Sequence, residues 1–173
     1  MNMTTKAHDM KFTLLTHERE MEKRSNTGRV VLEVLGAAAE QICWSRANPP
    51  AGLLEEIAAG GVALIYPGPA DAVNDDLTGI SRVILIDSTW QESRKIHQRS
   101  PYLHTLRRIC LNTTEKSVYN LRKNQKESGL CTAECVIEIL RATGETVRAE
   151  QLHERFLAYI RPQGAVRGEV PGH

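Results

Sequence analysis

Hydrophobic positions along the chain form short continuous runs that alternate with stretches of helical spacing. The apolar runs at Gly61–Tyr66 and Arg82–Asp87 are typical of strands buried on both faces of a parallel sheet. Lys11–Thr16 is expected to form a first strand. Two shorter strands are expected at Ile42–Trp44 and Arg108–Leu111. Apolar residues at helical spacing predict helices at Gly28–Ala39, Gly52–Ala59, Trp90–Arg99, Cys131–Ala142 and Ala149–Ile160. This alternation predicts a single α/β domain, with a mostly parallel sheet and helices on both faces.

Polar segments are expected to connect and end these elements. The charged stretch His17–Arg24 is interpreted as a loop, and Ser25–Thr27 supplies side chains that cap the helix from Gly28. The acidic stretch Asp71–Asp76 is predicted to be an exposed loop. Arg161–His173 contains three Gly and two Pro, which predicts a flexible C-terminal tail after a domain spanning residues 1–160.

Composition narrows the class of protein. A chain of 173 residues with 41% hydrophobic and 25% charged content is typical of one globular domain. No apolar run approaches the length of a membrane span, and the start carries Lys6, His8 and Asp9 where a signal peptide would be apolar. These features predict a cytoplasmic protein with no membrane partner. The sequence does not predict its oligomeric state.

The four cysteines, at positions 43, 110, 131 and 135, are expected to be reduced thiols. They lack the Cys-x-x-Cys spacing of structural zinc sites. Cys131 and Cys135 share one helical face, but two ligands with no further Cys or His nearby make a poor site. No metal is therefore expected.

The charge of the chain is unevenly distributed. The segment Arg94–Lys126 holds nine basic residues and one acidic residue, a net of +8, whereas the rest holds 13 basic and 20 acidic residues, a net of −7. This asymmetry favours a basic face for a polyanion such as RNA over an ordinary solvated surface. Tyr102 and Tyr119 lie within the segment and either stack on bases or pack in the fold.

Asp87 is the principal candidate for chemistry. It ends an apolar strand, and Thr89-Trp90-Gln91-Glu92 fits a capping box that starts the next helix. In parallel α/β sheets, ligands bind outside the carboxyl ends of the strands, so the loops after Tyr66 and Asp87 are the first candidates for a site. A carboxylate held there and walled by Trp90 is suited to act as a general base. The alternative is that Asp87 only satisfies amides of the turn.

A second constellation follows at Tyr119-Asn-Leu-Arg122 and Ser128 to Glu134. Gly129 interrupts the chain just before the helix at Cys131, whose first amides are suited to bind a carboxylate or ribose oxygens. Plain helix capping is the alternative. The sequence contains neither a phosphate-binding P-loop nor a Gly-x-Gly-x-x-Gly pattern.

These blocks together resemble the DTW-domain family, the tRNA-uridine aminocarboxypropyltransferases. The resemblance covers roughly Lys11 to Leu140. It rests on blocks in the family's order: Ser25-Asn-Thr-Gly-Arg29, Tyr66-Pro67, Asp87-Ser-Thr-Trp90, Glu92-Ser-Arg94-Lys95, Ser100-Pro-Tyr-Leu103, Tyr119-Asn-Leu-Arg122 and Leu130-Cys-Thr-Ala-Glu134. Two departures are the lack of a cysteine-rich segment before Cys43 and the presence of Ser88 where Gly is common.

The resemblance implies a SPOUT-like, knotted α/β fold and a transfer of the 3-amino-3-carboxypropyl group of S-adenosylmethionine to N3 of a tRNA uridine. Asp87 is the implied base. The implied cofactor walls are Tyr66, Pro67, Thr89, Trp90, Leu130, Cys131, Thr132 and Glu134. The implied tRNA contacts are Arg29, Arg94, Lys95, Arg99, Arg107, Arg122 and Lys123. Two alternatives stay open at this point, a SPOUT-type tRNA methyltransferase and a non-catalytic tRNA-binding module.

Overall fold

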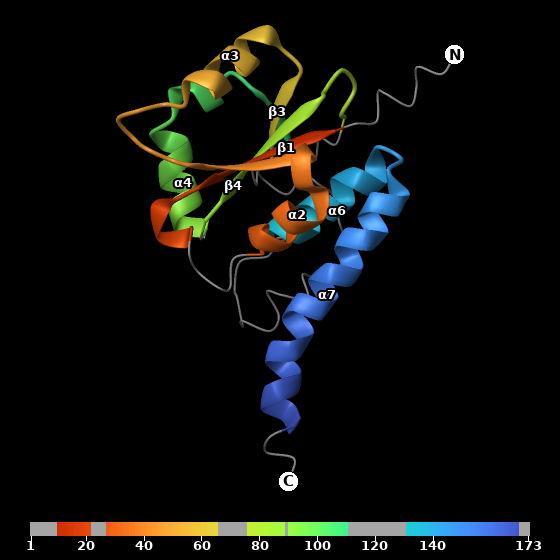
Figure 1. Cartoon of the computed structure of the whole chain (residues 1–173). Helices are drawn as coiled ribbons and strands as arrows, with labels where there is room; N and C mark the ends of the chain where they lie inside the picture. The colour runs from red at the N-terminus through yellow and green to blue at the C-terminus, as the bar shows by residue number, and fades with distance from the viewer. Residues whose placement is uncertain (1–9, 22–26, 66–75, 89, 111–130, 170–173) are drawn as a thin grey trace, which may run out of the picture.

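Five parallel strands form the centre of the molecule, in the order β2-β1-β4-β3-β5. The structure is a computed structural model that describes residues 10–21, 27–65, 76–88, 90–110 and 131–169 (Figure 1). The strands are β1 (Lys11–Thr16), β2 (Ala39–Cys43), β3 (Val62–Ile65), β4 (Arg82–Asp87) and β5 (Arg107–Ile109). The predicted parallel sheet is thus confirmed for the described residues.

Helices cover both faces of this sheet, as the sequence predicts (Figure 1). One face carries α2 (Gly28–Leu35), α6 (Thr132–Ala142) and α7 (Thr146–Glu169), and the other carries α3 (Ala51–Ala59) and α4 (Trp90–Gln98). Short 3-10 turns lie at Glu18–Glu20, Gly36–Ala38 and Pro101–Leu103. The SPOUT-like knot stays a prediction, since residues 111–130 between β5 and α6 lie outside the described part of the chain.

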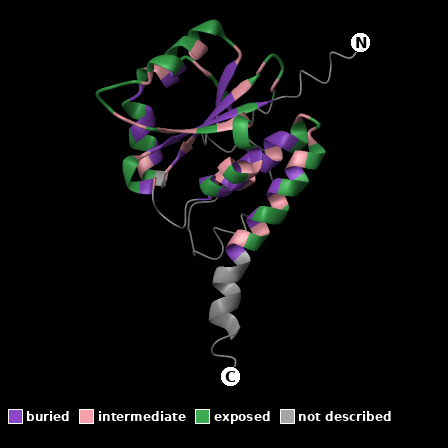
Figure 2. Ribbon diagram, viewed as in Figure 1, coloured by how far each residue is buried: buried purple, intermediate pink, exposed green. Residues whose placement is uncertain are grey.

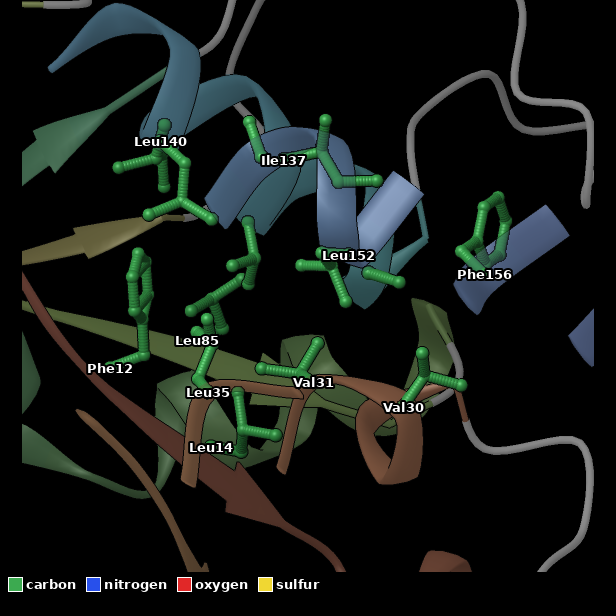
Figure 3. Packing of buried hydrophobic residues seen from close by; sticks show 14 of the residues in the cluster. Phe12, Leu14, Val30, Val31, Leu35, Leu85, Ile137, Leu140, Leu152 and Phe156 are labelled. Carbon is green, nitrogen blue, oxygen red and sulfur yellow. The ribbon is translucent and has the colours of Figure 1, made fainter. Parts of the chain in front are cut away.

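The larger apolar core lies between the sheet and α2, α6 and α7 (Figure 3). Phe12 and Leu14 of β1 are fully buried there, together with Val31 of α2, Leu140 of α6 and Leu152 of α7. Each such side chain contributes about 1.5–3 kcal/mol by leaving water. Figure 2 shows the buried residues following the strands and the inner sides of the helices.

A smaller core fills the opposite face of the sheet. Leu15 alternates with Phe12 and Leu14 along β1 and joins Ile84 of β4, Leu53 of α3 and Ile96 of α4. Alternating apolar residues on one strand therefore bind both helical layers to the same sheet.

The helices that follow neighbouring strands β1 and β4 lie on opposite faces. β1 leads into α2 on one side, and β4 leads into α4 on the other. In open α/β sheets, ligands bind at such a reversal, outside the carboxyl ends of the two strands. The fold thus marks the ends of β1 and β4 as the place for a site.

The first helix is shorter than the sequence predicts. α2 ends at Leu35 because Gly36 has φ of +55°, a left-handed conformation that interrupts the helix, and β2 already begins at Ala39. Thr27 precedes α2 but makes no side-chain capping bond to it. The predicted loop after β1 contains the 3-10 turn Glu18–Glu20.

The last helix is longer than predicted. The helical backbone of α7 continues from Ile160 through Pro162 to Glu169, where the sequence predicts the start of a tail. Proline and glycine weaken a helix without excluding it, so they are imperfect markers of its end. The flexibility of residues 161–173 stays a prediction. Within the described residues, no helix is long and apolar enough to cross a membrane.

Candidate functional site

Asp87 lies at the carboxyl end of β4, opposite Thr16 at the end of β1. Its side chain is buried, with 7% of the residue exposed. The Thr16 hydroxyl donates to Oδ2 of Asp87 at 3.4 Å, and the Thr132 hydroxyl donates to Oδ1 at 2.7 Å. Because Thr132 is the first residue of α6, two strands and a helix that are distant in sequence meet at this carboxylate.

This hydrogen-bond network extends to the edge strand. Gln41 of β2 donates from Nε2 to the Thr16 hydroxyl at 3.3 Å. The network therefore orients the Asp87 carboxylate.

Ser88 follows Asp87 and carries a buried hydroxyl. Among the residues that the structure describes, this hydroxyl has no hydrogen-bond partner. Burying such a group without a partner costs about 1–3 kcal/mol. A polar ligand that reaches the end of β4 would remove that cost.

Side chains at the start of α6 cap its first backbone amides. Glu134 accepts from the backbone amide of Cys131 at 3.1 Å, and the Cys131 sulfur completes the capping box. Thr27, just before α2, accepts from the amide of Ala133 at 3.3 Å. The capping alternative is therefore observed for Cys131 and Glu134, and their contact with a cofactor stays a proposal.

Neither thiol of α6 is suited to act as a thiolate. Desolvation raises the pKa of Cys131 well above its usual range, with Glu134 acting in the same direction. Burial raises the pKa of Cys135 to about 12. Within the described ranges, no three His, Cys, Asp or Glu side chains gather as metal ligands would.

Two aromatic rings stand beside the network. His17 follows Thr16, and its ring stacks on Trp44 with centroids 6.1 Å apart and planes at 27°. The Trp44 indole N–H donates to the buried Ser100 hydroxyl at 2.9 Å, and its backbone N–H donates to the carbonyl of Thr16 at 2.7 Å. Arg19 lies nearby in the same loop and pairs with Glu92 of α4 at 3.8 Å.

The predicted tRNA contacts separate into two groups. Arg94 and Lys95 are exposed on α4, Arg99 is exposed directly after its last residue, and Arg29 is exposed in the first turn of α2. Arg107 lies instead at the amino end of β5, on the opposite edge of the sheet. Its guanidinium donates to the carbonyls of Asp76 and Thr78 at 3.0 and 2.9 Å, so it holds the segment before β4.

Several predicted residues lie outside the described part of the chain: Tyr66, Pro67, Thr89, Tyr119, Arg122, Lys123 and Leu130. Trp90 begins α4 as predicted. Tyr102 packs against the smaller core, and burial raises the pKa of its hydroxyl, which supports the packing alternative. The sequence does not single out Thr16, Gln41, His17 or Trp44, because only the register of the sheet brings these strand ends together.

The sequence matches the family model described as DTW domain over residues 2–163. It is also similar to the Drosophila melanogaster protein named tRNA-uridine aminocarboxypropyltransferase 2, with 35% identity over 81 residues. That alignment spans 44% of this chain and 32% of the relative, about a third of its length. No solved structure matches the chain significantly.

Proposed function

The chain belongs to the DTW domain family, and on this premise we propose that it is a tRNA-uridine aminocarboxypropyltransferase. In the proposed reaction, N3 of a tRNA uridine forms a bond to the γ-carbon of the 3-amino-3-carboxypropyl group of S-adenosylmethionine. The bond between that carbon and sulfur breaks, its electron pair stays on sulfur, and 5′-methylthioadenosine leaves. The N3 proton passes to a base on the protein.

The observation that carries this proposal is the placement of Asp87. A uridine N3–H is a weak acid and a poor nucleophile until its proton is drawn away, so the reaction needs a fixed acceptor. Asp87 is buried at the carboxyl end of β4 and is oriented by Thr16 and Thr132. A carboxylate held in this way is suited to take the N3 proton.

The residues around Asp87 fit an amino-acid-bearing sulfonium compound. S-adenosylmethionine would supply the electrophilic γ-carbon when bound. Ser88 offers a buried hydroxyl, without a partner among the described residues, to an ammonium or carboxylate, and Asp87 offers a negative charge to a cation. Thr89, Trp90, Thr132 and the residues at the ends of β3 and before α6 complete the proposed walls.

Positioning must decide which group is transferred. A sulfonium activates each of its three attached carbons, so the carbon held next to the nucleophile reacts. We assign this selection to the residues at the carboxyl ends of β1 and β4, where the threonine network orients Asp87. The proposed tRNA contacts are Arg29 and the exposed side of α4, with Arg122 and Lys123 outside the described residues.

The direct test uses S-adenosylmethionine labelled either in the methyl group or in the carboxypropyl group. Each form is incubated with purified protein and tRNA, and label is counted in the RNA. The proposal predicts label only from the carboxypropyl group, together with 5′-methylthioadenosine. Label only from the methyl group would identify a methyltransferase instead, and no label from either would favour a tRNA-binding module.

A further inference from the structure

We propose that His17 and Trp44 form a nucleobase-stacking site at the carboxyl ends of β1 and β2. The identification of that base as part of the RNA rests on the proposed function. The two rings come from the carboxyl ends of neighbouring strands β1 and β2, on the same edge of the sheet as Asp87. The two rings stack with their planes at 27° to each other. A flat heteroaromatic ring can stack on the outer face of such a pair.

Both rings are fixed in place before any ligand arrives. Trp44 packs against the smaller apolar core, and its indole N–H is committed to Ser100. The His17 Nδ1 accepts from the backbone amide of Arg19 at 3.1 Å, which pins the imidazole at the start of the 3-10 turn. With its donor committed, Trp44 meets a ligand only through its ring, and preorganised rings lose little freedom on binding.

The pair is also tied to the proposed catalytic group. The Trp44 backbone donates to the Thr16 carbonyl, and the Thr16 hydroxyl donates to Asp87. The rings and the carboxylate thus lie at neighbouring strand ends, with Trp44 on the side of the smaller core and Asp87 bonded to α6 on the other side. Neither residue is fully buried, so the pair is open to solvent on the side away from the core.

The surrounding charges favour a base that belongs to RNA. Arg19 has 75% of its side chain exposed, and Arg46 is exposed two residues after Trp44. Through Ser100, Trp44 is joined to the end of α4. Arg94 and Lys95 are exposed on this helix, and Arg99 is exposed directly after it. Aromatic rings flanked by arginines are the usual means of holding single-stranded RNA bases and their phosphates.

The test is a binding measurement that needs no transfer of any group. Isothermal titration is carried out with a uridine-rich single-stranded RNA octamer and, separately, with S-adenosylmethionine alone. The variants are His17→Ala, which removes the ring, and His17→Phe, which keeps a ring but loses the Nδ1 acceptor. His153→Ala on α7 is the matched control, because this partly exposed histidine lies on a helix of the other layer.

We expect His17→Ala to weaken RNA binding by about 5- to 150-fold, the range of one base-stacking contact, while His17→Phe and His153→Ala stay close to the wild type. If His17→Ala instead weakens only S-adenosylmethionine binding, the stacked base is the adenine of the donor, and the stacking site still stands. The site is overturned if His17→Ala binds both ligands like the wild type, or if His17→Phe loses as much as His17→Ala. If the protein transfers no aminocarboxypropyl group, the proposed function is refuted. The binding measurements on the His17 variants still test the stacking site in that case.

Discussion

At the scale of single residues, the Asp87 carboxylate is held from two sides by hydroxyl groups. Thr16 reaches it from the neighbouring strand and Thr132 from the start of α6. Hydrogen bonds to a charged group are worth about 1.5–3 kcal/mol each, and those in buried networks also fix direction. We infer that Thr132 is a positioning residue whose effect on the reaction passes through Asp87.

Replacing Thr132 with Val removes this donor at nearly constant volume. We predict a loss of about 10- to 100-fold in kcat, the equivalent of one hydrogen bond to a charged group. Removing a donor also favours the protonated carboxyl, so the acid limb of the pH–rate profile shifts to higher pH. The measurement is the pH dependence of kcat with labelled S-adenosylmethionine.

Two matched variants separate positioning from stability. Thr132→Ser keeps the hydroxyl and should restore the wild-type profile. Thr143→Val removes the side-chain hydrogen bonds of a threonine at the other end of α6, where its hydroxyl donates to the carbonyls of Ile139 and Leu140. A Thr132→Val enzyme with unchanged kcat and pH profile would rule out the positioning role.

The sequence predicts the chemical role of a residue only where the motif that indicates this role is continuous along the chain. Asp87 is foreseen because it ends an apolar run and precedes a helix start. Its partners are separated from it by 71 and 45 positions, so only the register of β1 on β4 and the docking of α6 reveal them. The pairing of His17 with Trp44 depends on the same register and was not predicted.

At the scale of elements, the strands were the most predictable part. β1 and β4 match their predicted bounds because continuous apolar runs have few alternatives in a buried parallel sheet. The end of α2 was missed because it depends on the left-handed conformation of Gly36, and the end of α7 was missed because Pro162 and Gly164 do not stop its helix. Helix ends depend on backbone details that periodicity does not contain.

His97 lies on the inner side of α4, where its surroundings disfavour the protonated imidazole. Burial lowers the pKa of His97 below its usual 6.5, and the nearby Arg108 and His104 act in the same direction. The rings of His97 and His104 lie with centroids 4.7 Å apart, and His104 Nε2 lies 2.7 Å from the His97 carbonyl. Because α4 and the following turn meet at this pair, its protonation strains the contact between them.

We therefore predict that the protein loses stability as the pH falls. The unfolded chain binds a proton at His97 more readily than the folded chain does, so the free energy of unfolding is highest above pH 6.5 and declines as the pH falls through and below this value. Urea denaturation between about pH 8 and pH 5 measures this slope. His97→Gln should flatten it, whereas His153→Gln should not. An equal slope in all three proteins would contradict the prediction.

At the scale of the whole molecule, a net charge of +1 conceals a basic segment on an otherwise acidic chain. The described basic residues of this segment lie in different elements. Arg94 and Lys95 are exposed on α4 and Arg99 is exposed just after it, whereas Arg107 holds the segment before β4 from the amino end of β5. We propose that the α4 group, and not Arg107, contacts tRNA phosphates.

Salt dependence of tRNA binding tests this division. Combined replacement of Arg94, Lys95 and Arg99 with Ala should weaken binding and reduce the slope of log affinity against log salt by about 2 to 3, since each phosphate contact contributes about 0.7 to 0.9. Arg141→Ala, at the carboxyl end of α6, removes an exposed charge from the far end of that helix and should leave the slope unchanged. An unaltered slope in the triple variant would place the tRNA elsewhere.

The proposed transfer to tRNA is tested most directly by mass spectrometry of tRNA nucleosides from cells that lack this protein. The strain is complemented with the wild-type chain or with Asp87→Ala, and binding of tRNA by both proteins is measured in parallel. We predict that 3-(3-amino-3-carboxypropyl)uridine is absent from the deletion strain, returns with the wild-type chain and does not return with Asp87→Ala, which still binds tRNA. An unchanged level of this nucleoside without the protein, or its full return with Asp87→Ala, would contradict the proposed function of the site.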